Sequence, residues 1–328
     1  MNYLQLLKYF TAYYSALLKQ KRFIKKYLQP FFDETCNEID LQLSQADRKK
    51  ILIYYPAFTV LAGAENYLIL RNRKLTYKER WQLTYVAAMA SLCDDLIDEE
   101  NWSATQLFNL LDNKLYNLPE SKKSILILVL NTELNKKYAL PKKYKQLLRN
   151  AIQSQANSIK QLNPNISYEE IIKISQKKNG NTSLMFASLI DEEWSKEESA
   201  VIYQSGFMGQ LVNDTYDIFK DVNDGVQTFI QRHKTIDDAE EFFINEWKFL
   251  GELIDECSTN KNQNKKLINR FACMHAYALV AFDQFRKIEK GTTIDWKAAT
   301  RKQLVIDMEL WSTRIKLLKK IKQLSSIR

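Results

Sequence analysis

The sequence from Val86 to Glu100 is Val-Ala-Ala-Met-Ala-Ser-Leu-Cys-Asp-Asp-Leu-Ile-Asp-Glu-Glu. Up to the cysteine it is small or apolar on every face of a helix, a pattern typical of a helix that is buried all round. Five carboxylates follow, and they need partners because unpaired charge is costly to bury. Asp94 and Asp98 are four residues apart and therefore share one helix face. This pattern favours a bound cation over a solvated helix end.

A second acidic stretch follows another apolar helical run. Its sequence is Asn213-Asp214-Thr215-Tyr216-Asp217-Ile218-Phe219-Lys220-Asp221. Within it Asn213, Asp217 and Asp221 are spaced i, i+4 and i+8, so they lie along one helix face. Oxygen ligands in such rows suit Mg²⁺, which leaves its other coordination sites to water and substrate phosphates. Two such rows facing each other across a helical bundle would hold two or three Mg²⁺ ions and a diphosphate.

A third segment carries candidate anion ligands. It is Lys177-Lys178-Asn179-Gly180-Asn181-Thr182-Ser183. We expect the helical pattern to break at Gly180 and to restart with Thr182 or Ser183 as the cap. A helix N-terminus beside a lysine is suited to a diphosphate, and Lys178 is the preferred ligand over Lys177. A solvated loop with surface lysines is the alternative.

The composition favours helices throughout. Only 7 Gly and 5 Pro occur in 328 residues, against an ordinary share of about 12% for the pair. Apolar residues recur at spacings of three and four, and strand-type alternation is absent. We predict an all-α fold with one domain over residues 1–328, because neither a repeat nor a linker is evident. The predicted helices are 3–29, 48–71, 76–99, 103–117, 121–136, 141–162, 167–190, 195–222, 236–258, 262–289 and 295–324.

The net charge of +9 is dispersed over many helices. A positive excess attracts anions of several kinds, including nucleic acid, anionic lipid and phosphorylated substrates. A nucleic-acid-binding surface would need basic residues concentrated on one face with aromatic residues between them, whereas here the sharpest local charge is acidic. We therefore predict no nucleic-acid partner, and a non-catalytic basic helical binding protein is a further alternative.

Two features bear on location. No apolar run is long enough to span a bilayer, and residues 1–20 lack the pattern of a secretory signal. The four cysteines have no C-x-x-C spacing, which predicts reduced thiols and a cytoplasmic location. The amphipathic segment from Tyr3 to Leu28 suits peripheral contact with a membrane surface, and a packed N-terminal helix is the alternative.

The acidic motifs resemble those of the class I isoprenoid synthase superfamily, over nearly the whole chain, and the closest motifs are those of bacterial terpene cyclases. Asp94-Asp95-x-x-Asp98 matches the aspartate-rich D-D-x-x-D motif. Asn213-Asp214-x-x-Asp217-x-x-Lys220-Asp221 is similar to the cyclase N-D-x-x-S/T-x-x-K-E motif, with Asp217 in the Ser/Thr place and Asp221 in the Glu place. The segment around Lys178 is similar to a helix break that contacts diphosphate in related enzymes. The resemblance implies an all-α bundle around a central active-site cavity, and homodimers are common among such families.

Other members of the superfamily offer alternatives. Gln210-x-x-Asn213-x-x-x-Asp217-x-x-x-Asp221 resembles squalene and phytoene synthases, which join two prenyl diphosphates head to head. Their Y-C-Y-x-V-A-G helix is absent from the sequence. The G-G-K-R segment of chain-elongating prenyltransferases is also absent, with Arg71 and Arg73 as a loose substitute. Cyclisation, head-to-head coupling and elongation thus stay open.

Our hypothesis at this point is Mg²⁺-dependent ionisation of a linear prenyl diphosphate, followed by cyclisation to a terpene hydrocarbon or alcohol. The expected catalytic residues are also the metal ligands, and cations complete the diphosphate site. Aromatic faces would stabilise the carbocation in a dry cavity, although most aromatic residues at helical spacing belong to the core. The expected metal ligands are Asp94, Asp98, Asn213, Asp217 and Asp221; the diphosphate ligands are Lys178, Lys220 and Arg314; the cavity-lining residues are Phe58, Phe186, Phe207, Tyr216 and Trp311.

Overall fold

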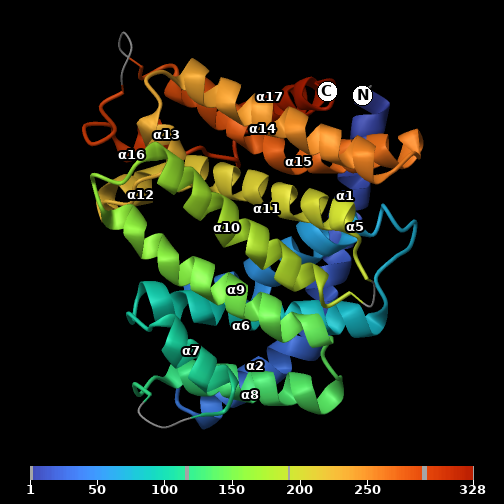
Figure 1. Cartoon of the computed structure of the whole chain (residues 1–328), viewed down its shortest axis with the longest axis vertical. Coiled ribbons are helices and arrows are strands. Elements are labelled where there is room, and N and C mark those ends of the chain that lie inside the picture. The colour runs from blue at the N-terminus through green and yellow to red at the C-terminus, as the bar shows by residue number, and fades with distance from the viewer. Residues whose placement is uncertain (1–2, 115–117, 191–192, 290–293, 328) are drawn as a thin grey trace. The chain divides into compact units, whose positions relative to one another are not determined.

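The computed structural model describes residues 3–114, 118–190, 193–289 and 294–327. All regular elements in these ranges are helical and none is a strand (Figure 1), which confirms the predicted all-α fold. Residues 115–117, the predicted end of the helix 103–117, lie outside the described residues. Among the described helices, none combines the length and apolar character that would be needed to cross a membrane.

The chain divides into two compact units. The first consists of residues 1–8, 157–183 and 194–328, and the second of residues 9–156 and 184–193. The single domain expected from the sequence stays a prediction.

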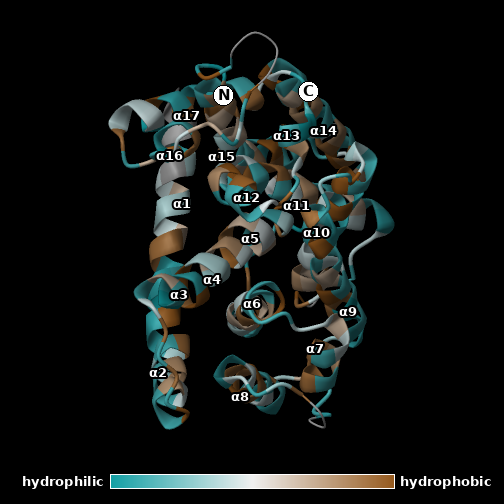
Figure 2. Cartoon of the chain, turned by 90° about the vertical axis from the view of Figure 1, so that its left-hand side faces the viewer, coloured by the Kyte–Doolittle hydropathy of each residue, from teal (hydrophilic) through white to brown (hydrophobic). Residues whose placement is uncertain are grey.

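The second unit is built around α6 (Tyr77–Asp98). A capping box of Thr76 and Glu79 fixes the start of α6, and the helix is buried on every side along most of its length, as its small and apolar sequence predicts. It packs against α8 (Lys122–Lys137) and α4 (Tyr55–Phe58), as Figure 2 shows in a nearly end-on view of α6. The other helices with most of their residues in this unit are α1 (Tyr3–Phe23), α2 (Gln29–Glu38), α3 (Gln45–Lys49), α5 (Glu65–Tyr67), α7 (Ala104–Leu111) and α9 (Lys142–Asn157).

The first unit is built around α11 (Lys196–Tyr216) and α15 (Lys261–Phe285). These two helices pack against each other and against α14 (Ile236–Cys257), and α15 also packs against α17 (Trp311–Leu324). Its remaining elements are the 3₁₀ segment Ser158–Leu162, most of α10 (Tyr168–Ala187), α12 (Ile218–Asp224), α13 (Phe229–Arg232) and α16 (Arg301–Leu304).

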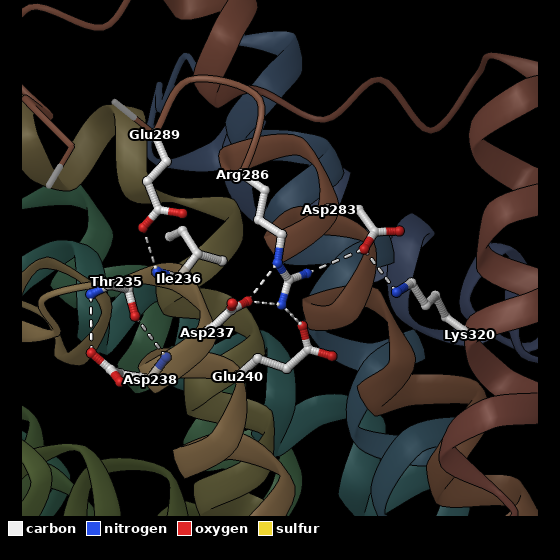
Figure 3. A network of polar contacts seen from close by, with 9 residues as sticks. All are labelled: Thr235, Ile236, Asp237, Asp238, Glu240, Asp283, Arg286, Glu289 and Lys320. Atoms are coloured by element: carbon white, nitrogen blue, oxygen red, sulfur yellow. Dashed lines mark hydrogen bonds and ion pairs between the residues drawn. The ribbon is translucent and has the colours of Figure 1, made fainter. Parts of the chain in front are cut away.

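An ion-pair network connects three helices of the first unit (Figure 3). The guanidinium of Arg286, just after α15, bonds to Asp237 and Glu240 on α14 and lies 3.4 Å from the Oδ1 atom of Asp283. Lys320 on α17 also bonds to Asp283, at 2.8 Å. Arg286 therefore holds the N-terminal end of α14 beside the C-terminal end of α15.

One predicted helix end at a proline is wrong, and a second proline lies inside a helical path as predicted. The helix expected to end at Gln29 continues through Pro30 to Glu38, because a π-helical turn at 24–28 precedes the proline. Pro56 likewise follows a π-helical turn at 50–54. A proline lacks the N–H that an α-helix uses and its ring crowds the preceding turn, so the wider turn accommodates both prolines without ending the helical path.

Two predicted helices are interrupted. The helix expected at 195–222 divides at Asp217, which has φ −89° and ψ 2° between α11 and α12. The helix expected at 295–324 is represented by α16 and α17, with the chain leaving helical geometry between them. The predicted helices ran across both interruptions, because the local sequence pattern does not exclude helix at either place.

Candidate functional site

The first acidic cluster lies at the C-terminal end of α6, as predicted. Asp95 is the most buried of its carboxylates, with 2% of its surface exposed. Its Oδ1 atom bonds to the Lys50 ammonium, and its Oδ2 atom lies 3.6 Å from Lys123 Nζ. Lys123 also bonds to Glu99 at 2.6 Å. The charge of Asp95 is therefore already balanced by two lysines of the second unit.

Asp94 and Asp98 have neutral hydrogen-bond donors instead. The Tyr55 hydroxyl donates to Asp94 Oδ2 at 2.6 Å, and the Gln155 side-chain amide donates to Asp98 Oδ1 at 3.1 Å. Burial and the neighbouring aspartates hold the pKa of Tyr55 well above its usual value, so this phenol stays a donor. Asp95 is thus paired with lysines, while Asp94 and Asp98 each accept a hydrogen bond from a neutral side chain.

The second acidic cluster continues across the junction of α11 and α12. The backbone N–H of Asp217 donates to the Asn213 carbonyl at 2.8 Å, and the N–H of Asp221 donates to the Asp217 carbonyl at 2.9 Å. These i to i+4 bonds keep the three residues in helical succession although α11 ends at Tyr216. The predicted row of Asn213, Asp217 and Asp221 is therefore present in the backbone.

Asp214 is a site residue that the sequence analysis did not select. Only 3% of its surface is exposed, and its Oδ1 atom accepts a 2.7 Å hydrogen bond from the Gln210 side chain. Its Oδ2 atom has no hydrogen bond of normal geometry among the described residues, although the Ser175 hydroxyl lies near enough to lower the pKa of Asp214. Burial raises the pKa of Asp214 to about 7. Asp214 could have been selected because it follows Asn213 in the acidic motif, but the motif alone does not indicate that its side chain is buried.

The carboxylates of this cluster repel one another. Burial, followed by the charges of Asp214 and Asp217, raises the pKa of Asp221 to about 8. Partial loss of hydration also raises the pKa of Asp217, although its side chain keeps exposed surface. Lys178 lowers the pKa of all three carboxylates, but too little to offset their desolvation. The cluster is therefore short of positive charge.

Lys178 lies on α10, where the predicted helix break is wrong. α10 is continuous from Tyr168 to Ala187, and the Thr182 hydroxyl donates to the Lys178 carbonyl rather than capping a new helix. Lys178 is half-buried whereas Lys177 is exposed, and Lys178 is the lysine that acts on the aspartates. The cluster is thus opposed by a side chain on a continuous helix and not by a helix N-terminus.

Gly180 has a packing role instead. A Cβ atom there would lie 2.5 Å from the Tyr203 ring on α11. Gly206 makes the reciprocal contact, since a Cβ atom there would lie 2.4 Å from the carbonyl oxygen of Asn179 and 2.4 Å from Ser183 Oγ. Glycine at both positions lets the two backbones approach closely, as such contacts require. This close approach brings Lys178 within electrostatic range of the carboxylates.

The other two predicted diphosphate ligands are solvent-exposed. Lys220 follows Asp217 on α12, lies 3.9 Å from Asp224, and lowers the pKa of Asp217 and Asp221. Arg314 on α17 donates from Nε to the Met308 carbonyl at 3.0 Å. Both remain predicted ligands.

The predicted cavity-lining aromatic residues occupy different environments. Phe58 and Trp311 are exposed, whereas Phe186 and Phe207 are buried. Tyr216 is half-buried, with its ring 5.9 Å from that of Tyr277 and its hydroxyl 3.4 Å from the Met308 sulfur. Their role around a carbocation stays a prediction.

The second acidic cluster is the part of the candidate site whose residues best suit a divalent cation. Within the described ranges, no group of three or more His, Cys, Asp or Glu side chains is gathered closely enough to hold an ion. The Oδ2 atom of Asp214, which has no hydrogen bond of normal geometry in the part of the chain that the structure describes, and the raised pKa values of Asp214 and Asp221 nevertheless mark a place where added positive charge would be stabilising. Carboxylate and amide oxygens are the donors that Mg²⁺ accepts.

The two arginines considered for chain elongation are engaged elsewhere. Arg73 forms two hydrogen bonds to the Glu79 carboxylate, at 2.7 and 3.0 Å. Arg71 donates to the Glu193 carbonyl at 2.9 Å. They stabilise the start of α6 and a backbone segment within the second unit.

Comparison with protein-family models and with curated proteins finds no match. A solved structure that resembles the chain is that of a geranyltransferase from Legionella pneumophila, with 15% sequence identity, a TM-score of 0.39, and coverage of 77% of this chain and 98% of the other.

Proposed function

We propose that this protein is a Mg²⁺-dependent enzyme that ionises an allylic prenyl diphosphate, with cyclisation of the resulting carbocation as its main reaction. One observation carries the proposal. Asp214, Asp217 and Asp221 follow one another along α11 and α12, and Lys178 and Lys220 lower their raised pKa values without restoring the ordinary ones. A site that needs added cations suits a substrate whose own charge is balanced by metal ions.

The substrate class comes from the sequence motifs. The D-D-x-x-D pattern and the second motif of α11 and α12 resemble those with which class I isoprenoid synthases bind a prenyl diphosphate through Mg²⁺. Asn213, Asp217 and Asp221 would hold ions in the first unit, and Asp94 and Asp98 would do so in the second. That both clusters act on the same substrate is part of the sequence prediction and stays one.

The chain's own residues would position the anion and the metal ligands. Bound Mg²⁺ would supply Lewis-acid neutralisation of the leaving diphosphate. Lys178, which is half-buried on α10, would pair with a diphosphate oxygen. Tyr55 and Gln155 would orient Asp94 and Asp98 through the hydrogen bonds they already donate. Gln210 would fix the orientation of Asp214.

The test is product analysis with the purified full chain and Mg²⁺. Geranyl, farnesyl, geranylgeranyl and longer prenyl diphosphates are supplied singly, with and without isopentenyl diphosphate, and extracts are examined by mass spectrometry. We expect a cyclic hydrocarbon or alcohol from one diphosphate alone. Absence of both diphosphate release and any product from every substrate would contradict the proposal.

Variants connect the activity to the site. Asp217→Ala and Asp94→Ala should each lower turnover by at least about 100-fold, the upper end of what changing only the hydrogen-bond partner of a metal ligand costs. Asp224→Ala is the matched control, because Asp224 is an exposed neighbour on α12 that lies 3.9 Å from Lys220. Far-UV circular dichroism verifies that all three variants keep their helical content. Full activity of Asp217→Ala would remove the metal assignment.

Head-to-head transfer is the second candidate. It is favoured by Gln210, which is buried in the second cluster and bonds to Asp214, and which occupies the first position of the squalene and phytoene synthase-like pattern. The same product analysis separates the two, because a transferase would give a product that contains two prenyl chains.

A further inference from the structure

Helix α17 carries two separate apolar stripes. The first consists of Leu317, Ile321 and Leu324, which are all buried in a helix that packs against α15. The second consists of Trp311, Ile315 and Leu318, which are spaced i, i+4 and i+7 and point away from the first. A helix that only completed a core would need the first stripe alone.

The second stripe is open to solvent. Trp311 is 76% exposed and Ile315 is 51% exposed, and Leu310 directly before the helix is 53% exposed. Large apolar side chains that gather on one exposed helix face, rather than being scattered singly, indicate a surface with a partner.

Cations surround this stripe. Four exposed basic side chains project from α17, and no acidic residue occurs from Leu310 to the end of the sequence. Lys320, on the packed side, pairs with Asp283. The Arg314 guanidinium lies 5.4 Å from the Trp311 ring centroid, so charge and aromatic surface are adjacent. The four exposed basic residues are Arg314, Lys316, Lys319 and Lys322.

We propose that this outward face of α17 docks on an anionic lipid surface. An indole and branched aliphatic side chains suit the boundary between headgroups and acyl chains, while the lysines reach anionic headgroups with their extended stems. A nucleic acid is less suited to this face, since a strand-binding surface presents several aromatic platforms and α17 has one. The inference assigns Trp311 and Arg314 to this face in place of the cavity and diphosphate roles predicted from the sequence, and it leaves the other residues of the proposed catalytic site unchanged.

The test is co-sedimentation of the full chain with vesicles of phosphatidylcholine alone or with 30 mol% phosphatidylglycerol, at low and high salt. We expect binding that requires the anionic lipid and weakens with salt. Lys319→Glu combined with Lys322→Glu should lower the partition coefficient at least about 25-fold, since each basic residue near such a surface contributes about fivefold. Trp311→Ala combined with Ile315→Ala should lower it comparably.

Matched controls separate this face from general charge attraction. Lys265→Glu with Lys266→Glu on α15 changes the net charge equally, and both of these lysines are exposed. Phe249→Ala on α14 removes an exposed aromatic residue elsewhere. Both controls should retain most of the binding. A blue shift of tryptophan emission on adding anionic vesicles, absent in Trp311→Phe, reports directly on the docked face.

Three results would overturn the proposal. One is no binding to anionic vesicles at low salt, and another is an equal loss of binding in the α15 control. The third is a change of oligomeric state in Trp311→Ala with Ile315→Ala, which would identify the stripe as an interface between copies of the chain. Circular dichroism and thermal unfolding of each variant verify that α17 is folded.

Discussion

Replacing Gly206 by alanine tests how the candidate site is assembled. The added Cβ atom would lie 2.4 Å from the Asn179 carbonyl oxygen, 2.4 Å from Ser183 Oγ and 2.9 Å from the Asn179 carbonyl carbon. Ordinary contacts begin near about 3.5 Å, so α10 would have to withdraw from α11 by roughly 1 Å. Two of the three contacts are with backbone, which a change of side-chain rotamer cannot relieve.

The expected size of the effect follows from two opposing contributions. Overpacking of this kind costs about 1–3 kcal/mol, while alanine in place of glycine favours a helix by about 1 kcal/mol. Gly209→Ala on the same helix is the matched control, because a Cβ atom there would meet nothing within 4 Å. It should therefore show the favourable contribution alone. The two variants should differ in stability by about 1–3 kcal/mol, the overpacking contribution itself.

Thermal unfolding monitored by circular dichroism measures this difference. An unfolding entropy of about 2.1 cal/mol/K per residue gives about 1.5 °C per kcal/mol for 328 residues. Gly206→Ala should therefore melt about 1.5–4.5 °C below Gly209→Ala, which itself should melt at or above the wild-type temperature. Adding Ser183→Ala to Gly206→Ala should restore only part of the loss, because the Asn179 carbonyl contact persists. Equal melting temperatures for Gly206→Ala and Gly209→Ala would refute the close approach of α10 and α11.

Three further predictions concern charge. The pKa of Asp221 in the folded protein is about 8, above its ordinary value of 3.8, so the stabilising contribution of its protonated form is present at acid pH and lost as pH rises through about 8. In EDTA, the melting temperature of Asp221→Asn should therefore rise relative to that of wild type between pH 5 and 9, and Mg²⁺ should narrow this difference. A difference that does not depend on pH would contradict the assignment. Arg286→Ala should lower the free energy of unfolding in a urea titration by about 1–2 kcal/mol, because Asp237, Glu240 and Asp283 lose their shared partner. The control Lys136→Ala, at an exposed lysine, should change it by less than about 0.5 kcal/mol. Asp95→Asn should cost about 2–3 kcal/mol, since it leaves Lys50 and Lys123 beside a neutral buried amide, and an unchanged urea midpoint would show that these ion pairs are not stabilising.

The parts of the fold that the sequence predicts well have local causes. The predicted helix 236–258 corresponds to α14 (Ile236–Cys257), and 76–99 corresponds to α6 (Tyr77–Asp98). Each begins at a capping box, formed by Thr235 with Asp238 and by Thr76 with Glu79. These signals involve residues three positions apart, so the sequence contains them directly.

The errors depend on contacts between distant residues. Gly180 suggested a helix break, but its local preference is overridden by packing against Tyr203 on α11. Asp214 lies in a motif that was identified, yet its burial depends on how α11 is covered by other helices of the first unit. Periodicity assigns a residue to a helix face, but it does not say how deeply that face is buried.

The two acidic clusters differ in how they balance charge, although their sequences look alike. In the first, Lys50 and Lys123 neutralise Asp95, and Lys123 also pairs with Glu99. In the second, burial and mutual repulsion raise the pKa values of Asp214 and Asp221 despite Lys178. The second cluster therefore lowers the stability of the folded chain at neutral pH, and the close packing of α10 and α11 at Gly206 keeps it in place. Such a cluster is expected where a bound cation compensates for the repulsion. The proposed function therefore predicts that Mg²⁺ stabilises the protein mainly through the second cluster.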